Sequence, residues 1–112
     1  MNPFKEYTNA MIRQYFARQP ENSHDSVAQA IIAAESLPDK VDQLNYVCTA
    51  SVVTQLSDKD QEILRRVFSG SDRAALAGAV RICAEDMHVS DRYVWHVVRS
   101  TSKEIARKRG LI

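Results

Sequence analysis

Apolar residues recur at intervals of three and four throughout this 112-residue chain, and no long run alternates apolar with polar residues. The first spacing places side chains on one face of a helix, whereas alternation is typical of a strand. The composition, 45% hydrophobic and 26% charged, is sufficient for a buried core, and only 3 Gly and 3 Pro interrupt the chain. We therefore predict an all-α fold, a small helical domain of about five or six helices.

Proline and capping residues divide residues 1–55 into three predicted helices. Pro20 ends the first helix, which begins near the N-terminus. Ser23 N-caps the second and Pro38 ends it, and Asp39 N-caps the third. The residues expected to face the core are Phe4, Tyr7, Met11, Ile12, Tyr15, Phe16, Val27, Ala30, Ile31, Ala34, Val41, Leu44, Val47, Cys48 and Val52.

Three further helical stretches are predicted in the rest of the chain. Ser57 N-caps the first of them and Gly70 ends it. Gly78 disfavours the next stretch by about 1 kcal/mol relative to Ala, which leaves open whether it is one helix or two. Ser90 N-caps the last helix and Gly110 closes it. The expected inward residues are Ile63, Leu64, Val67, Phe68, Leu76, Ala79, Val80, Cys83, Val94, Val97, Thr101 and Ile105.

The most informative stretch is residues 79–103, AVRICAEDMHVSDRYVWHVVRSTSK. It predicts a helix that ends near Met87, a tight turn at His88-Val89-Ser90, and a second helix. Val89 is expected to fill the core at the turn, and Ser90 to cap the second helix. Two short helices that share one core in this way form a helix-turn-helix, whose second helix can enter a DNA major groove.

This stretch resembles region four of bacterial sigma factors, an arrangement that some phage late-gene activators share. Residues 85–90 are similar to the approach and turn of that motif, and residues 91–97 to its recognition helix. Residues 56–68 resemble the preceding helix of the same module. His88 stands where the family usually has glycine, and histidine tolerates a positive φ better than most residues. Nothing in residues 1–55 resembles the other parts of a sigma factor.

The resemblance implies a bacterial or phage transcriptional regulator that reads double-stranded DNA through its C-terminal recognition helix. It divides the chain into residues 1–55, a helical segment that extends the core or pairs two subunits, and residues 56–112, the DNA-binding module. The charge agrees with this division, because residues 91–112 carry a net charge of +4 and the rest of the chain −3. The predicted DNA-binding residues are Ser90, Asp91, Arg92, Tyr93, Trp95, His96, Arg99, Lys103, Arg107 and Lys108.

These residues have different expected roles. Arg92 is placed to pair with guanine, and Arg99 and Lys103, with the two basic residues after them, are placed to contact phosphates. Asp91 either accepts from a cytosine amine or stabilises the start of the helix. Trp95, one residue outside the core spacing, either packs on the N-terminal helices or contacts DNA or a partner. The backbone N–H groups after the Ser90 cap are also suited to hold a phosphate.

Patterns typical of enzymes and metal sites do not occur in the sequence. It contains no CxxC, HExxH, GxSxG or glycine-rich phosphate loop, so we expect neither catalysis nor a cofactor. Cys48 and Cys83 are expected to be free thiols in a cytoplasmic protein. No apolar run approaches the ~20 residues that span a bilayer, and charged residues occupy the N-terminal stretch where a signal peptide is apolar. We therefore expect no membrane contact.

Three functional interpretations follow. The first is a regulator bound to duplex DNA, for which a homodimer and a contact with RNA polymerase are options that the sequence leaves open. The alternative is a protein-interaction module that contacts RNA polymerase or a co-regulator without strong DNA binding of its own. A third interpretation is a phage packaging adaptor, which also uses helix-turn-helix units and would assemble as a large ring. The size of the protein in solution distinguishes the third from the other two.

Overall fold

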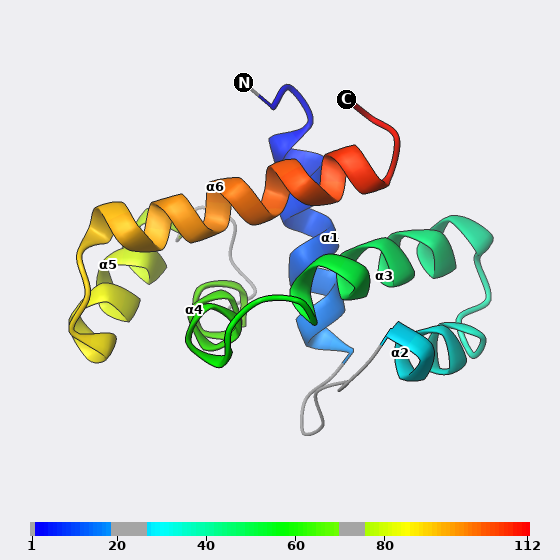
Figure 1. The fold of residues 1–112 in the computed structure, drawn as a ribbon, viewed down its shortest axis with the longest axis horizontal. Helices are drawn as coiled ribbons and strands as arrows, with labels where there is room; N and C mark the ends of the chain where they lie inside the picture. The colour runs from blue at the N-terminus through cyan, green and yellow to red at the C-terminus, as the bar shows by residue number, and fades with distance from the viewer. Residues whose placement is uncertain (1, 19–26, 70–75) are drawn as a thin grey trace.

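The computed structural model describes residues 2–18, 27–69 and 76–112, and this part of the chain is built from helices (Figure 1). The all-α prediction is confirmed. The predicted boundary residues Pro20, Ser23 and Gly70 lie outside the described residues. The six helices are α1 (Lys5–Ala17), α2 (Val27–Ala34), α3 (Lys40–Val53), α4 (Asp58–Phe68), α5 (Leu76–Met87) and α6 (Asp91–Lys108).

The long helix α6 connects the two halves of the fold. It lies against α5 and α4 near its start and against α1 and α3 farther along, whereas α2 packs mainly on α3 (Figure 1). One buried cluster includes residues of all six helices. The N-terminal helices α1 and α3 therefore share a core with the C-terminal part of the chain.

Capping interactions at the helix starts follow the sequence closely. The Asp39 carboxylate accepts hydrogen bonds from two backbone N–H groups in the first turn of α3, the shorter of them 2.7 Å. The Ser57 hydroxyl accepts from the backbone N–H of Asp60 at 3.2 Å. Both predicted caps are confirmed. Across Gly78, α5 is a single continuous helix, so the question left open by the sequence is resolved in favour of one helix from Leu76 onward.

The end of α6 is closed by Gly110, as predicted. Gly110 adopts a φ of +80°, which is accessible to glycine without a steric penalty. Its backbone N–H donates to the carbonyl of Arg107 at 3.1 Å, and the N–H of Leu111 donates to the carbonyl of Ala106 at 2.8 Å. These two bonds form a Schellman motif, which satisfies carbonyl groups left without partners in the last turn.

The inward faces of α1 and α2 differ from the prediction. Phe4 and Tyr7 are 40% and 43% exposed, and the inward face of α1 begins instead at the fully buried Thr8. In α2, Ala30 and Ala34 are buried while Ile31 is 45% exposed. The prediction from the spacing of large apolar residues is wrong at these positions. Small and polar side chains, not large apolar ones, lie at the contacts of α1 and α2 with the other helices.

The buried face of α3 is also rotated from the predicted one. Val41 and Leu44 are exposed, whereas Tyr46, Thr49 and Ala50 are buried. The Thr49 hydroxyl donates to the carbonyl of Asn45 at 2.8 Å, so its burial leaves no unsatisfied hydrogen-bonding group. Apolar spacing alone does not reveal a threonine that satisfies its hydroxyl within its own helix.

The predicted core of the C-terminal half is largely confirmed. The buried side chains of α4 are the four expected, Ile63, Leu64, Val67 and Phe68. In α6, the predicted residues are buried together with additional neighbours, and the complete set is Val94, Val97, Val98, Thr101, Ser102, Ile105 and Ala106. The inward stripe of α6 is therefore broad, and its opposite face is left open along the helix.

Candidate nucleic-acid interface

The turn between α5 and α6 is held by backbone geometry. His88 adopts a φ of +56°, as the glycine-like position of the turn predicted. Its N–H donates to the carbonyl of Glu85 at 3.3 Å, and the N–H of Val89 donates to the carbonyl of Ala84 at 3.0 Å. These bonds form a second Schellman motif. Val89 packs partly buried against the core, as expected, so the turn is anchored on its inner side.

The first turn of α6 is capped by Ser90. Its hydroxyl accepts a hydrogen bond from the backbone N–H of Tyr93 at 3.1 Å, which confirms the predicted N-cap. Asp91 is exposed in the same turn, where a carboxylate interacts favourably with the positive end of the helix dipole. The hydrogen bond from Tyr93 and the charge of Asp91 therefore both stabilise the start of α6 at this position.

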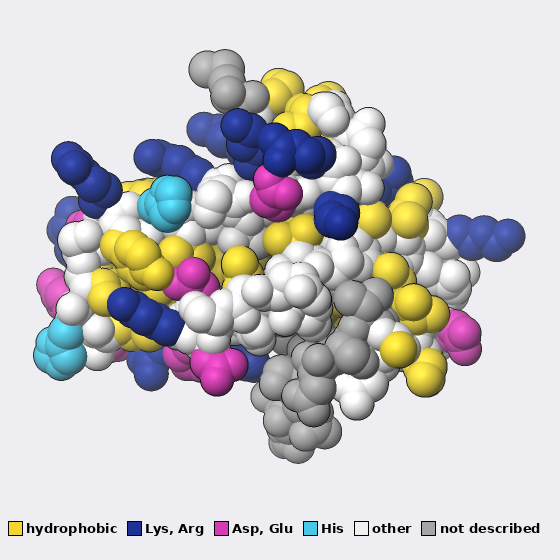
Figure 2. Space-filling view, viewed as in Figure 1, with side chains coloured by type: hydrophobic (Ala, Val, Ile, Leu, Met, Phe, Trp, Pro, Cys, Tyr) yellow, Lys and Arg dark blue, Asp and Glu magenta, His cyan; other side chains and the backbone are white. Residues whose placement is uncertain are grey.

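Five of the predicted residues lie along one exposed face of α6. They are spaced at i, i+4, i+7, i+11 and i+15, which places them within a narrow angular sector of the helix. At a rise of 1.5 Å per residue, this face extends about 22 Å. Figure 2 shows Lys and Arg side chains gathered over α6. We call these residues the basic stripe: Arg92, His96, Arg99, Lys103 and Arg107.

Most of the basic stripe is free of carboxylate partners. Arg107 forms an ion pair with Glu104 on the same helix. The Arg99 guanidinium lies over the Trp95 ring, 5.1 Å from its centroid, in a cation–π contact. Within residues 2–18, 27–69 and 76–112, no carboxylate forms an ion pair with Arg92, Arg99 or Lys103. Their charges are therefore available to an anionic partner.

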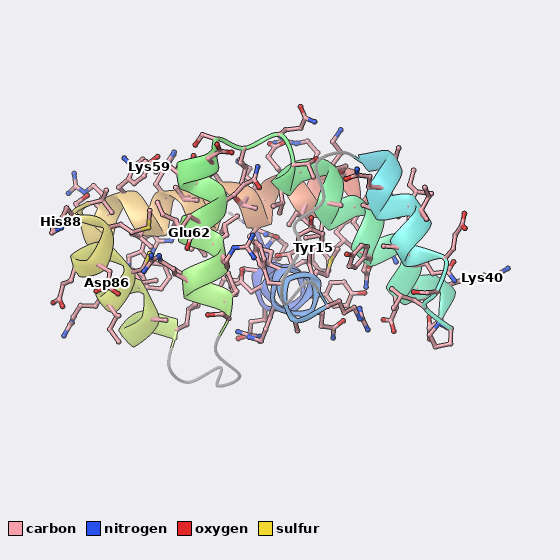
Figure 3. All side chains as sticks on the ribbon, turned by 90° about the horizontal axis from the view of Figure 1, so that it is seen from below. Tyr15, Lys40, Lys59, Glu62, Asp86 and His88 are labelled. Atoms are coloured by element: carbon pink, nitrogen blue, oxygen red, sulfur yellow. The ribbon has the colours of Figure 1, made fainter. Side chains whose placement is uncertain are left out.

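Tyr93 lies outside the basic stripe and faces α4. Its hydroxyl donates to the Asp60 carboxylate at 2.5 Å, and the Lys59 ammonium lies 4.8 Å from its ring centroid. Figure 3 shows Lys59 on α4. The hydrogen bond to Asp60 raises the pKa of Tyr93, with burial adding to the effect. The structure thus uses Tyr93 to join α6 to α4.

Trp95 packs partly buried against the core, at the edge of the basic stripe. It borders a surface groove between α6 and the N-terminal part of α1. Lys5 and Arg13 of α1 line this groove together with Arg99 and Lys103 of α6. These two α1 cations were not predicted, because they lie more than seventy residues away from α6 in the sequence and no local pattern connects them.

The far end of α6 differs from the rest of the predicted site. Lys108 is exposed but lies outside the angular sector of the stripe, beside α3, where its carbonyl lies 4.0 Å from the Cys48 Sγ. Burial raises the pKa of the Cys48 thiol, while Arg109 and Lys108 oppose that rise. Cys48 and Cys83 are both free, as predicted.

Helix α6 is braced from the other side by α1. Thr8 and Ser102 are both buried, and their hydroxyl groups are hydrogen bonded to each other. Asn2 donates to the Ser102 hydroxyl at 3.3 Å. The exposed stripe is therefore carried by a helix that packs on α1, α3, α4 and α5, so the backbone positions of its residues are fixed relative to one another.

The described part of the chain lacks the features of two other kinds of site. It contains no group of three or more His, Cys, Asp or Glu side chains suited to a metal ion. None of its helices is both long enough and apolar enough to cross a membrane. No protein-family model, curated protein or solved structure matches the chain. The features of the described residues that bear on function are therefore the basic stripe of α6 and the groove beside it.

Proposed function

We propose that this protein binds double-stranded DNA through the exposed face of α6 and regulates transcription in a bacterium or phage. In this proposal α5, the turn at residues 88–90 and α6 form a helix-turn-helix, and α6 is the recognition helix. The resemblance of this stretch to region four of sigma factors supports the same interpretation.

The observation that carries the proposal is the basic stripe. Duplex DNA carries one phosphate charge per about 1.7 Å of its axis, so a cationic surface about 22 Å long can meet several phosphates. Arg92 and His96 lie in the first half of α6, the part that contacts base edges in helix-turn-helix proteins. Lys103 and Arg107 lie farther along and are placed to contact the backbone, which positions the protein without reading sequence.

The mechanical support of the stripe also favours this function. Sequence reading requires side chains held in register with the bases, and loops provide this less well than a braced helix. The Schellman turn at His88, the Ser90 cap and the Tyr93–Asp60 hydrogen bond hold the start of α6 on α5 and α4. Asp91 is assigned to the helix start, since its carboxylate favours the positive end of the helix.

The sole tryptophan provides the first experiment. Trp95 contacts Arg99, so DNA that engages Arg99 should change the tryptophan fluorescence. We would titrate a mixed-sequence duplex at about 50 and 200 mM salt, with anisotropy of labelled DNA as a second readout. Binding that weakens by about 10²-fold or more across this range would indicate that several phosphates are neutralised. An unchanged fluorescence together with an unchanged anisotropy would contradict the proposal.

The groove between α1 and α6 favours a second candidate, contact with RNA polymerase or a co-regulator. The exposed aromatic residues Phe4 and Tyr7 border this groove together with Trp95. Aromatic side chains are enriched in protein interfaces. A module of this kind would capture its protein partner and show little salt-dependent affinity for free duplex DNA. A pull-down with purified RNA polymerase, with Trp95→Ala as the matched variant, tests this candidate directly.

A further inference from the structure

Helix α2 is apolar on all sides, and among the helices that the structure describes it packs mainly on α3. Gln29 is the sole polar residue of its sequence, VAQAIIAA. A helix that is hydrophobic all round is normally buried all round. In this fold α2 packs mainly on α3 and buries the small residues Ala30 and Ala34, while Ile31 and Ile32 are 45% and 68% exposed. The largest aliphatic side chains of α2 thus point away from the core.

Helix α3 extends this apolar surface. Val41 and Leu44 are three positions apart, which places them on one face of α3, and they are 50% and 46% exposed. Together with the two isoleucines, they account for half of the eight large hydrophobic residues found exposed in the described part of the chain. Figure 2 shows hydrophobic side chains gathered over α2 and α3. We call these four residues, Ile31, Ile32, Val41 and Leu44, the α2–α3 face.

The rim of this face carries charges of both signs. Glu35 follows α2 and Lys40 begins α3, and both are exposed. Neither forms an ion pair with another residue of the described ranges. In a twofold-symmetric interface each surface meets its own copy, so a rim with both signs can pair with itself. A foreign partner of one predominant charge would find repulsion at one of the two positions.

We propose that the α2–α3 face is the contact between two copies of this chain, with the four aliphatic residues at its centre and Lys40 of each copy opposite Glu35 of the other. Four aliphatic side chains form its centre, so we expect a weak dimer with a dissociation constant of about micromolar. The face lies at the opposite end of the molecule from the start of α6, as the positions of Lys40 and His88 show (Figure 3). Dimerisation therefore leaves the basic stripe open and does not depend on DNA binding.

Sedimentation equilibrium over about 1–200 μM protein tests this directly. The wild-type mass should rise with concentration toward twice the 12.7 kDa of one chain. Ile32→Glu and Leu44→Glu should each raise the dissociation constant at least about tenfold, because each places a carboxylate in the apolar centre. Ile82→Glu is the matched control, since Ile82 is 61% exposed on α5. Circular dichroism at low concentration should show the same helix content in all four proteins.

Reversing the charges of the two rim residues, Lys40 and Glu35, tests whether the partner is a second copy of this chain. Lys40→Glu should weaken association, and adding Glu35→Lys to it should restore association because the pairing is re-formed with reversed signs. A wild-type protein that remains monomeric up to 200 μM would overturn the proposal, as would variants that dimerise as well as wild type. Loss of dimerisation in Ile82→Glu alone would move the interface to α5. DNA anisotropy at monomer concentrations reports on α6 separately, so the two proposals fail independently.

Discussion

The Tyr93 hydroxyl donates a 2.5 Å hydrogen bond to the Asp60 carboxylate, which joins the first turns of α6 and α4. Each residue lies three positions after its N-cap, Ser90 or Ser57, and donates its backbone N–H to that cap, so this bond links two helix starts. The basic stripe begins one residue before Tyr93. A bond at this position therefore affects both the stability of the fold and the direction of the proposed recognition helix.

Replacing Tyr93 with Phe should lower the free energy of unfolding by about 0.5–1.5 kcal/mol, the usual net value of one hydrogen bond. The ring and its contact with Lys59 are retained. Urea unfolding at neutral pH measures the difference. Tyr7→Phe is the control, because among the described residues the Tyr7 hydroxyl has one hydrogen bond, which it accepts from the amide of the half-buried Asn45. An equal loss in both variants would contradict a special role for the Asp60 bond.

The same hydrogen bond should make stability sensitive to alkaline pH. The pKa of Tyr93 is raised in the folded protein, so the unfolded chain releases this proton first as the pH rises. The bond therefore contributes fully below the ordinary tyrosine pKa of about 10 and is lost progressively above it. The stability difference between wild type and Tyr93→Phe should shrink between pH 9 and about 11. The other tyrosines are common to both proteins and cancel, so a constant difference would contradict this.

The positive φ of His88 predicts an unusual order of stability among variants at this position. A β-branched residue is poorly tolerated in the left-handed region, so His88→Val should cost about 1–2 kcal/mol. His88→Gly should be neutral or stabilising by up to about 1 kcal/mol, because relief of backbone strain is offset by the greater freedom of the unfolded chain. The side chain is exposed, so packing does not complicate the comparison. Thermal unfolding of the three proteins gives the order.

Gly110 provides the control for this prediction. Its φ is +80°, and a Cβ added there would meet no atom within 4 Å. Gly110→Ala should therefore cost about 1 kcal/mol through the backbone alone. A neutral Gly110→Ala together with a neutral His88→Val would mean that these two turns are not held in the left-handed conformation in solution.

Local features of the fold were predictable because their causes are local. The caps at Asp39, Ser57 and Ser90 each depend on a side chain and the next three backbone N–H groups. The turn at His88 and the closure at Gly110 depend on the conformational freedom of one residue. The inward stripe of α6 follows from apolar spacing over five turns, which leaves a single wide face for the core.

Relationships between distant segments were not predictable in this way. The contact of Thr8 with Ser102 joins residues 94 positions apart, and both are polar, so an apolar pattern does not mark them. The same reason explains the rotation of α3 toward Thr49. For the candidate site, the ten residues predicted from the sequence include all five of the basic stripe, but the sequence did not predict that Tyr93 faces Asp60. The α1 cations beside the stripe also required the tertiary structure.

Two buried threonines should respond oppositely to the same substitution. The Thr8 hydroxyl contacts Ser102 and donates toward the carbonyl of Phe4 at 3.1 Å. The Thr101 hydroxyl is buried with no hydrogen-bond partner among the residues that the structure describes. Thr8→Val should cost about 1–3 kcal/mol, because the buried Ser102 hydroxyl loses its bond to Thr8 and keeps only the one that Asn2 donates. Thr101→Val should stabilise the protein by about 1 kcal/mol, because it removes an unsatisfied polar group. Urea unfolding compares them, and equal signs would contradict the assignment.

Two substitutions in the basic stripe should separate reading of DNA sequence from attraction to phosphate. Arg92→Ala should reduce discrimination between the preferred site and its variants by about 1–3 kcal/mol, because a bidentate contact with guanine is lost. Lys103→Ala should weaken binding to all duplexes equally and reduce the slope of log affinity against log salt by about one. Arg18→Ala is the control, since it removes one positive charge that pairs with Asp42 away from α6. Anisotropy titrations over several duplexes and salt concentrations provide these values. Wild-type affinity and specificity in both stripe variants would show that α6 does not read DNA.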